Sequence, residues 1–337
     1  MNLLRKILFP FAILYGIITS IRNFLFDIGI LKSYSFNIPI IAVGNLSLGG
    51  TGKTPQIEYL IRLLSPKYKV ATLSRGYKRK SKGFILADAN SNAEILGDEP
   101  FQFFTKFKKC QVAVDANRKK GIEKLLSLSD KPEIILLDDA FQHRKVKAGF
   151  YILLTSFDEL FTDDFIFPVG NLRESKKQAK RANMIIVTKC PATISEIAKD
   201  SIKQKIGDKV PLFFSSIDYD DAVFNENESK KVAEIKDQKL LVLAGIAKPE
   251  PFFNYFNSDA IMAFPDHHDF SENDIMKIKE KAQNKLIITT EKDFMRLSGK
   301  LPSAQLFYLP IKTRFVSEGE RFDSIITNYV ESSSRNG

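Results

Sequence analysis

The sequence contains no tryptophan, and it has only two cysteines and three histidines among its 337 residues. The cysteines, Cys110 and Cys190, lie far apart and in no metal-ligand pattern, which argues against a disulfide scaffold and against a cysteine-based zinc site. So few cysteines are typical of a protein that is kept in a reducing cytoplasm. Internal repeats and low-complexity tracts are also missing, so a repeat architecture is not indicated.

Negative charge is the scarcer sign in this chain. The 50 lysines and arginines outnumber the 40 aspartates and glutamates, which gives a net charge of +10 and a pI near 9.3. Such a balance favours an anionic partner, which could be nucleic acid, acidic lipid headgroups or a phosphorylated substrate. No helix-turn-helix, zinc-finger or RNP signature occurs, and the cations are spread along the chain. We therefore expect no nucleic-acid partner.

One long apolar run lies at the N-terminus. Residues 7–21 are almost entirely apolar, with Arg5 and Lys6 before them and Arg22 after them, and a second apolar patch follows at 24–31. The run is shorter than the roughly 20 residues that span hydrocarbon, and no signal-peptide cleavage site follows it. We expect a helix in or on the membrane interface, with its cations near anionic headgroups. A buried core helix is the alternative.

The strongest motif is a glycine-rich loop between an apolar strand and a helix start. The strand covers residues 38–43, and the loop contains Gly49, Gly50 and Gly52. Glycines let the backbone curl so that several N–H groups point into one hollow, which suits phosphate. Lys53 brings positive charge to the β- and γ-phosphates, and the Thr54 hydroxyl can ligate Mg²⁺. The expected nucleotide contacts are Gly49, Gly50, Thr51, Gly52, Lys53 and Thr54, with ATP as the expected nucleotide.

Apolar strand-like runs alternate with polar helical stretches through the rest of the chain, which is the α/β pattern. The first expected series has strands at 38–43, 68–73, 111–114, 133–137, 150–154, 184–188 and 212–216, helices at 55–64, 100–107, 118–126 and 175–182, and a small hairpin at 82–87. The second has strands at 240–244, 260–263, 285–289 and 305–309, and helices near 251–256, 272–282 and 320–330.

This order predicts a P-loop NTPase-like three-layer α/β sandwich, a second and smaller α/β domain without a phosphate loop, and an N-terminal membrane-associated helix. The length allows two domains with separate cores. The predicted units are an apolar segment (1–35), a P-loop domain (36–217), a charged linker or ribbon (218–236) and a C-terminal domain (237–337), with the tail at 331–337 disordered.

Two carboxylates, Asp138 and Asp139, follow the apolar strand at 133–137. In phosphate-loop enzymes, an acidic residue at such a strand end holds the Mg²⁺ that bridges the β- and γ-phosphates. The alternative is that the pair only caps the next turn. Because a phosphate loop precedes them, we favour the metal role.

The three histidines, His143, His267 and His268, all lie beside acidic residues in the sequence. A histidine held by a carboxylate can help to move or polarise a proton near neutral pH. Zinc binding by the adjacent pair is not expected, because neighbouring residues on an extended strand point in opposite directions and cysteine partners are missing.

Three further turns carry charged residues, and two of them place arginine at strand-to-helix turns, where the phosphate face of the sheet is expected. Gly97-Asp-Glu-Pro opens a helix with Asp98, Ser74-Arg-Gly-Tyr follows the strand at 68–73, and Gly170-Asn-Leu-Arg-Glu precedes a basic helix. Together with residues 44–55, 138–143, 266–268 and 290–293, these motifs resemble the tetraacyldisaccharide 4′-kinase family, the lipid A 4′-kinases. In that family the loop also lacks the first glycine of the general phosphate-loop pattern, and Ser47 occupies that place here. One departure from the family is Ala140, which stands where the family has glycine.

The resemblance implies a kinase that transfers the γ-phosphoryl of ATP to the 4′-hydroxyl of a tetraacylated glucosamine disaccharide 1-phosphate. It implies that Asp98 is the catalytic base, paired with His267 or His268 and more readily with His267, while Lys53 serves the phosphates. The implied metal ligands are Thr54, Asp138 and Asp139, with Glu174 assisting. The motifs also contain the candidate substrate contacts Asn45, Ser74, Arg75, Gln142, His143 and Arg173.

The implied location is the cytoplasmic face of the inner membrane, where the protein is peripheral or monotopic and meets its lipid substrate at an anionic surface. No obligatory protein partner is expected. The alternative function is a membrane-associated P-loop GTPase or ATPase that acts as a switch or assembly factor. The place where a GTPase carries Asn-Lys-x-Asp reads Thr188-Lys-Cys-Pro here, without the aspartate.

Overall fold

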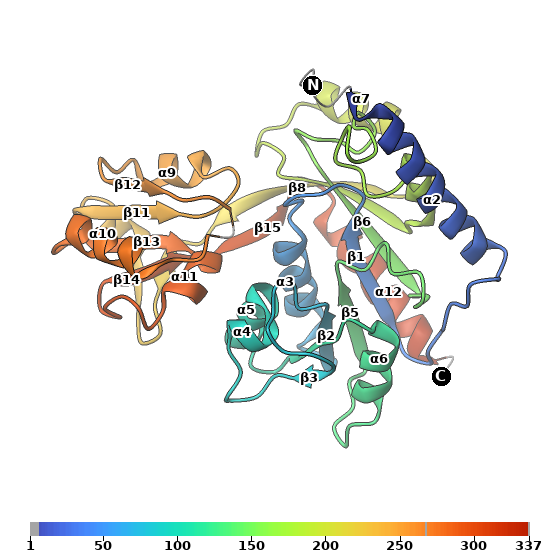
Figure 1. Ribbon diagram of the computed structural model, residues 1–337, viewed down its shortest axis with the longest axis horizontal. Coiled ribbons are helices and arrows are strands. Elements are labelled where there is room, and N and C mark those ends of the chain that lie inside the picture. The colour runs from blue at the N-terminus through green and yellow to red at the C-terminus, as the bar shows by residue number, and fades with distance from the viewer. Residues whose placement is uncertain (1–6, 267, 336–337) are drawn as a thin grey trace.

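The computed structural model describes residues 7–266 and 268–335. They form two units, each built on its own β-sheet, with the smaller unit standing to one side of the larger (Figure 1). The large sheet has nine strands within the described residues, in the order β15-β8-β7-β6-β1-β5-β2-β4-β3. The small sheet has six, in the order β10-β9-β14-β13-β11-β12. Both are α/β arrangements, as the sequence predicts.

The large sheet is parallel in its centre and antiparallel at its two edges. Its inner strands are nearly continuous apolar runs that are buried on both faces, which is characteristic of a parallel sheet covered by helices. The strands are β1 (Ile40–Asn45), β2 (Val70–Ser74), β3 (Ile85–Leu86), β4 (Gln111–Val114), β5 (Ile134–Asp138), β6 (Phe150–Ser156), β7 (Met184–Thr188), β8 (Leu212–Tyr219) and β15 (Ile311–Phe315).

Helices cover both faces of this sheet, which makes the three layers. On one face, α3 packs Ile57, Leu60 and Ile61 into the same cluster as Phe322 and Ile326 of α12. On the other face, α6 and α7 bury their apolar sides in separate clusters. The helical elements of this unit are α2 (Phe9–Asp27), α3 (Lys53–Leu64), α4 (Ala93–Leu96), α5 (Asp98–Lys106), α6 (Arg118–Leu126), η1 (Lys176–Arg181), α7 (Glu196–Ile206) and α12 (Gly319–Arg335).

The smaller unit has a parallel core of four strands with an antiparallel ribbon at one edge. Its core lies on both sides of the central strands, against short helices. Its elements are β9 (Ala222–Phe224), β10 (Ser229–Lys231), α8 (Val232–Ile235), β11 (Leu240–Ala244), α9 (Glu250–Phe256), β12 (Ile261–Ala263), α10 (Glu272–Ala282), β13 (Leu286–Thr290), α11 (Glu291–Leu297) and β14 (Leu306–Leu309).

The C-terminal segment differs from the prediction. The sequence places residues 237–337 in one domain, but β15 pairs antiparallel with β8 of the large sheet, and α12 packs on that sheet. The chain therefore crosses between the units twice, through β8 and through β15 (Figure 1). The predicted disorder at 331–337 is wrong up to Arg335, where α12 ends, because the apolar side of this helix continues to the buried Val330.

The segment 218–236, predicted as a linker or ribbon, folds as the end of β8 followed by β9, β10 and α8, and β9 and β10 form an antiparallel ribbon. Two other local predictions change. The hairpin expected at 82–87 is instead one short strand, β3, that pairs antiparallel with β4. The basic helix expected at 175–182 is the 3₁₀ helix η1, whose N-cap Ser175 accepts a hydrogen bond from the Lys177 N–H. Short segments of this kind depend on tertiary contacts more than on their own propensity.

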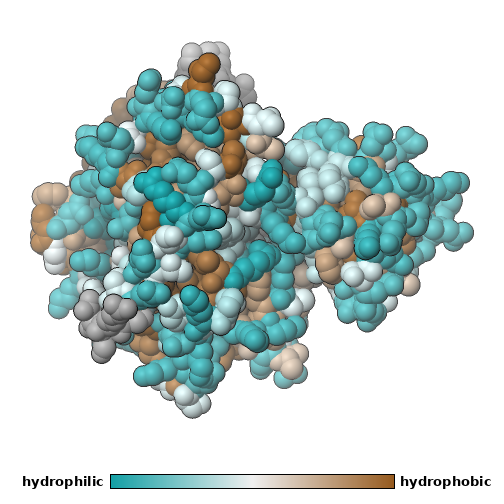
Figure 2. All heavy atoms as spheres, turned by 180° about the vertical axis from the view of Figure 1, so that it is seen from behind, coloured by the Kyte–Doolittle hydropathy of each residue, from teal (hydrophilic) through white to brown (hydrophobic). Residues whose placement is uncertain are grey.

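The N-terminal apolar run forms the helix α2, which is long and apolar enough to cross a membrane by length and composition. Only 17% of its most apolar window is buried against the rest of the protein, so α2 is not a core helix. The Tyr15 hydroxyl fastens it by donating to the Arg173 carbonyl at 3.1 Å. Figure 2 shows a mainly hydrophilic surface with apolar patches on the larger unit, including one at the edge farthest from the smaller unit.

Candidate active site

The glycine-rich loop lies where the sequence predicts, between β1 and the N-terminus of α3. Gly49 and Gly52 have φ values of 110° and 80°, a region that L side chains rarely adopt, so the loop needs glycine there. The loop is fastened to the end of β7, because the Thr188 hydroxyl donates to the Thr51 carbonyl at 2.8 Å. The N–H groups of the first turn of α3 have no partners within the helix, and they present the positive end of its dipole to the loop.

Lys53 begins α3, and its ammonium group faces the end of the neighbouring strand. Its Nζ lies 3.5 Å from Oδ1 of Asn45 and 3.7 Å from Oδ1 of Asp139. The parallel register sets Val43 of β1 opposite Asp138 of β5, so the loop and the carboxylates leave the sheet at the same edge. Thr54 is the next residue of the same first turn. The predicted phosphate and metal residues are therefore brought together.

The two carboxylates differ in their electrostatic environment. Burial, and then the neighbouring Asp139, raise the pKa of Asp138 to about 6. Burial by itself would also raise the pKa of Asp139, but Lys53 and Arg173 outweigh it and bring that pKa to about 2. Asp139, with φ 46°, carries the strained backbone of this turn, whereas Ala140 stays outside the left-handed region. Alanine in place of the family's glycine is therefore compatible with the turn.

Three of the predicted substrate contacts lie together, because Arg173 and Gln142 both bind Asn45. Arg173 binds both carboxylate oxygens of Asp139, at 2.8 and 3.0 Å, and it also donates to the backbone carbonyl and the side chain of Asn45. The Gln142 amide donates to the same Asn45 carbonyl at 2.8 Å. The Gly170-Asn-Leu-Arg motif reaches the loop through its backbone as well, because the Leu48 N–H donates to the Asn171 carbonyl at 2.7 Å.

Glu174 does not fit the metal role that the sequence assigns to it. Its side chain is almost fully buried, and both carboxylate oxygens are engaged by arginines. Arg181 donates to Oε2 at 2.6 Å, and Arg22 of α2 lies 3.5 Å from Oε1. Glu174 therefore joins α2 and η1 to the turn that carries Arg173, and it acts as a structural carboxylate.

His143 is not held by a carboxylate, in contrast to the expectation from its sequence neighbours. Burial, and then the nearby Arg118 and Arg22, lower its pKa to about 4. The imidazole is therefore neutral at pH 7, and its buried Nε2 has no hydrogen-bond partner among the described residues. A neutral ring can donate or accept a hydrogen bond, but it adds no charge to the site.

The low pKa of His143 predicts a pH effect on stability. The unfolded chain takes up a proton near pH 6.5 and the folded chain only near 4, so this residue destabilises the fold as the pH falls through that window. We expect the His143→Gln variant to lose less stability than the wild type between pH 7.5 and pH 4.5, by about 2 kcal/mol after allowance for partial exposure. Urea unfolding at both pH values measures the difference, and equal losses in the two proteins would contradict it.

Asp98 is the first residue of α5, directly after Gly97, whose φ is 92°. A side chain at Gly97 would lie 3.1 Å from the Tyr77 carbonyl, so the Gly97-Asp-Glu-Pro and Ser74-Arg-Gly-Tyr motifs are in contact. Ser74 donates to Oδ2 of Asp138 at 3.2 Å, whereas Arg75 is exposed.

The histidine motif predicted to serve Asp98 lies at 266–268. His267, the favoured partner, lies outside the described residues, so that pairing stays a prediction. The ring of His268 is 3.0 Å from Asp274 and stacks on Phe264. Asp98 forms an ion pair with Arg296 of α11. The same arginine donates to the backbone carbonyl of His268 at 2.7 Å. The histidine motif is thus linked to Asp98 through Arg296.

Sequence reasoning missed two arginines of this region, Arg118 and Arg296. Arg118 begins α6, is 3% exposed, and donates to the Asp138 carbonyl at 3.0 Å. Its only local signal is the N-cap Asn117, which marks a helix start and not a function. Arg296 lies far from every phosphate motif in the sequence, and only the docking of the smaller unit brings it to Asp98.

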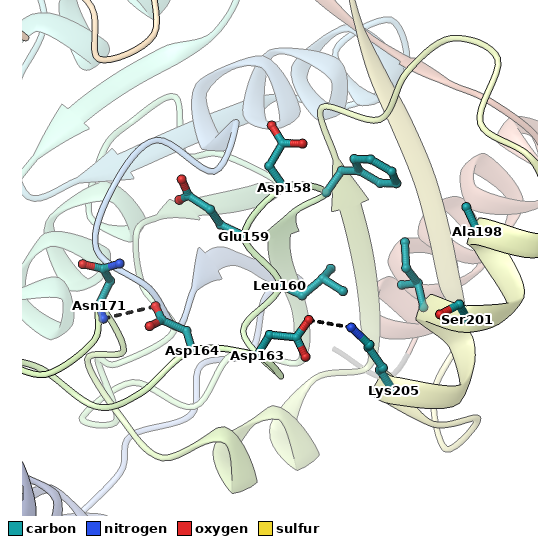
Figure 3. Close-up of a pocket in the computed structure, with 11 residues that line it drawn as sticks. Asp158, Glu159, Leu160, Asp163, Asp164, Asn171, Ala198, Ser201 and Lys205 are labelled. Carbon is teal, nitrogen blue, oxygen red and sulfur yellow. Dashed lines mark hydrogen bonds and ion pairs between the residues drawn. The ribbon is translucent and has the colours of Figure 1, made fainter. Parts of the chain in front are cut away.

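A separate cavity of about 510 Å³ lies between the segment after β6 and the helix α7 (Figure 3). Its lining includes four carboxylates, and one of them, Asp163, pairs with Lys205 at 2.7 Å. Such a lining repels the phosphates of a nucleotide. Asn171 links the cavity to the glycine-rich loop, since its backbone N–H donates to Asp164 while its carbonyl accepts a hydrogen bond from the Leu48 N–H. The cavity contains none of the residues predicted for the active site.

Comparison with known proteins gives one consistent result. A family model described as tetraacyldisaccharide-1-P 4′-kinase matches residues 4–331. Proteins called tetraacyldisaccharide 4′-kinase from Flavobacterium psychrophilum and Bacteroides fragilis are 68% and 43% identical, over 100% and 99% of this chain and 100% and 95% of their own lengths. The crystal structure of LpxK from Aquifex aeolicus in complex with ATP superposes with a TM-score of 0.80 at 30% identity, over 97% of this chain and 100% of that one.

Proposed function

Because the chain belongs to the tetraacyldisaccharide-1-P 4′-kinase family, we propose roles for its residues in the reaction of that family. The chain is an ATP-dependent tetraacyldisaccharide 4′-kinase of lipid A synthesis, which transfers the γ-phosphoryl of ATP to the 4′-hydroxyl of its substrate. The observation that supports the roles is the convergence of Lys53, Asp138 and Asp139 on the glycine-rich loop at one edge of the large sheet.

The loop from Gly49 to Thr54 binds the phosphates of ATP. Its backbone N–H groups and the positive end of the α3 dipole attract the phosphate oxygens, and Lys53 adds a full positive charge. The Lys53 ammonium group lies 3.7 Å from Asp139, and the phosphates of ATP compete with this carboxylate for it. In this role Lys53 offsets the charge that develops on the transferring phosphoryl group.

The residues near Lys53 also fit a magnesium ion. Asp138, Asp139 and the Thr54 hydroxyl supply hard oxygen donors. Mg²⁺ suits such a set, since it retains waters and shares phosphate oxygens with the substrate. Burial, and then the neighbouring Asp139, raise the pKa of Asp138, so a cation held by this pair would favour its ionised form. When bound, such an ion would supply positive charge that offsets the charge of the nucleotide phosphates.

Asp98 acts as the general base. As the substrate's 4′-oxygen forms its bond to the γ-phosphorus, the hydroxyl proton passes to the Asp98 carboxylate, and the bond from that phosphorus to the bridging oxygen breaks to release ADP. A sugar hydroxyl is a weak nucleophile, so a positioned carboxylate is needed. The turn that carries Asp98 contacts the Ser74-Arg-Gly-Tyr motif, whose Ser74 donates to Asp138, and this supports the placement of the base.

The sugar and its 1-phosphate bind on the side of the candidate active site to which both α2 and α6 contribute residues. Buried polar atoms there have no protein partners among the described residues, namely Oε1 of Gln142, Nε2 of His143 and Nε of Arg118. Burying such atoms without partners costs about 1–3 kcal/mol each, so a polar ligand that reaches them is favoured. Arg75 and Arg118 bring positive charge to the same place and suit an anionic group.

The exposed side of α2 places the enzyme at the membrane, where its substrate's acyl chains remain. Phe11, Leu14 and Ile18 lie on one side of the helix and are 63%, 57% and 56% exposed. On the adjacent side of the helix, Tyr15 and Arg22 hold it against the active-site network. With the net charge of +10, this arrangement fits peripheral or monotopic binding to an anionic surface, on the cytoplasmic face of the inner membrane, where ATP is available.

Replacing Phe11, Leu14 and Ile18 together with serine will weaken binding to anionic vesicles at least about tenfold, because each side chain loses most of its transfer free energy. ATP binding will stay within about twofold, since Tyr15 and Arg22 are untouched. Vesicle sedimentation and nucleotide titration measure the two effects. Ile197→Ser with Met276→Ser is the control, because both residues are exposed apolar side chains outside α2. Unchanged sedimentation of the triple variant would exclude α2 as the membrane contact.

The function is tested by incubating the purified chain with γ-labelled ATP, Mg²⁺ and the tetraacyl disaccharide 1-phosphate in detergent, followed by lipid extraction. We expect label in the organic phase without any protein partner or nucleic acid. Membership of this family favours an ATP-dependent kinase over the alternative, a GTPase switch. Excess GTP will therefore not abolish the transfer of label from ATP. Label that remains in the aqueous phase as free phosphate would contradict the proposed transfer.

A further inference from the structure

An ion pair joins the two units at the residue proposed as the base. Arg296, from α11 of the smaller unit, donates to Oδ2 of Asp98, the first residue of α5 in the larger unit. The two side chains are only 13% and 17% exposed, so the pair is largely removed from solvent. A charge-assisted hydrogen bond in such surroundings is stronger than one at an open surface.

The same guanidinium group holds a second segment of the smaller unit. Its other terminal nitrogen donates to the backbone carbonyl of His268 at 2.7 Å. The His268 ring is itself restrained, 3.0 Å from Asp274 and between the rings of Phe264 and Phe270. The planar guanidinium fork therefore fixes Asp98 relative to a segment that is already rigid.

The attachment of α11 to α5 does not depend on this ion pair alone. At the far ends of the same two helices, Lys106 of α5 pairs at 2.7 Å with Glu291 of α11 and at 2.7 Å with Glu58 of α3. Two separate contacts thus hold the helices together. Only the one made by Arg296 touches Asp98, so the two can be separated by mutation.

We propose that Arg296 is a positioning residue for Asp98, which orients the carboxylate toward the sugar hydroxyl only while the smaller unit is docked. This inference rests on the proposed role of Asp98 as the base. A carboxylate at the start of a helix has two rotatable side-chain bonds, and a displacement of about 1 Å from its working position costs up to about a hundredfold in rate. Arg296 removes that freedom by binding one oxygen from a fixed direction.

The test measures the kinetics of five variants, the fifth of which is Asp98→Asn alone. We expect Arg296→Gln to lower kcat about 10- to 100-fold, with the KM for ATP within about twofold. Arg296→Lys will recover part of the rate, because an ammonium group can still pair with Asp98 but cannot also reach the His268 carbonyl. Glu291→Gln is the matched control at the other end of the helix pair. Glutamine has nearly the same shape as glutamate but no charge, so this variant weakens the pair with Lys106 and leaves the contact with Asp98 in place.

The fourth variant combines Arg296→Gln with Asp98→Asn, and its residual rate in single turnover is compared with that of Asp98→Asn alone. If Arg296 acts through Asp98, adding Arg296→Gln to Asp98→Asn will change the residual rate less than about twofold. Multiplicative losses, or an equal loss of kcat in Glu291→Gln, would overturn the inference while leaving the base role intact. Wild-type kcat in Asp98→Asn alone would overturn the base role itself. Thermal unfolding of each variant separates these outcomes from loss of the fold.

Discussion

Replacing Asp98 with alanine will abolish phosphoryl transfer while leaving ATP binding nearly unchanged. The general base supplies typically 10²- to 10⁴-fold of the rate, and its loss leaves the sugar hydroxyl with no acceptor for its proton. Asp98 belongs to α5, whereas the phosphates are held by the loop before α3, so nucleotide affinity does not depend on this carboxylate. Transfer of label to lipid and titration with a fluorescent ATP analogue measure the two quantities.

Glu94→Ala is the control for this experiment. Glu94 lies in α4, shortly before Asp98, and forms an exposed ion pair with Lys80. Exposed pairs of this kind contribute about 0–1 kcal/mol, so we expect wild-type transfer. Residual activity of Asp98→Ala within tenfold of the wild type, or a parallel loss of nucleotide binding, would exclude the proposed role of Asp98.

Replacing Lys53 with methionine will lower both ATP affinity and transfer, with the larger effect on transfer. The ammonium group interacts most strongly with the phosphoryl group as negative charge develops on it, and removal of such a group typically costs about 10²- to 10³-fold in kcat. Methionine keeps a similar length and an apolar stem, so the change is mainly one of charge. The loss also leaves Asp138 and Asp139 without their nearest lysine, which further disfavours an ionised pair.

Lys67→Met is the matched control, because Lys67 is exposed just beyond the C-terminus of the same helix, α3. Its replacement removes the same charge from the protein but not from the loop. The measurements are KM for ATP and kcat with saturating lipid. A fall in ATP affinity with unchanged kcat would assign Lys53 to ground-state binding alone and contradict its proposed part in the transfer step.

Much of the large unit follows from local sequence. Each central strand is a short apolar run that must be covered on both faces, and the glycines, Lys53 and Thr54 stand next to one another in the chain. The carboxylates Asp138 and Asp139 also end a recognisable strand. Because the carboxyl ends of parallel strands meet at one edge of the sheet, the sequence is enough to bring these motifs together.

The errors share one cause, which is that the residues concerned act on partners far away in the chain. Glu174 resembles a metal ligand in the sequence, but Arg22 and Arg181 occupy both its oxygens. His143 follows two aspartates in the sequence, yet burial and arginines from α2 and α6 determine its pKa. No local pattern reports such contacts, because they depend on which helices pack beside the turn.

The sequence by itself determined the phosphate loop, the order of the central strands' motifs, the apolar N-terminal helix and the family, since these depend on neighbouring residues and on the spacing of apolar side chains. The tertiary structure alone decided that residues 311–335 return to the large sheet and that Arg296 meets Asp98. The reason is physical. An amphipathic helix or strand requires an apolar surface to pack on, and a buried charge requires a partner, but neither requirement specifies where in the chain that surface or partner comes from.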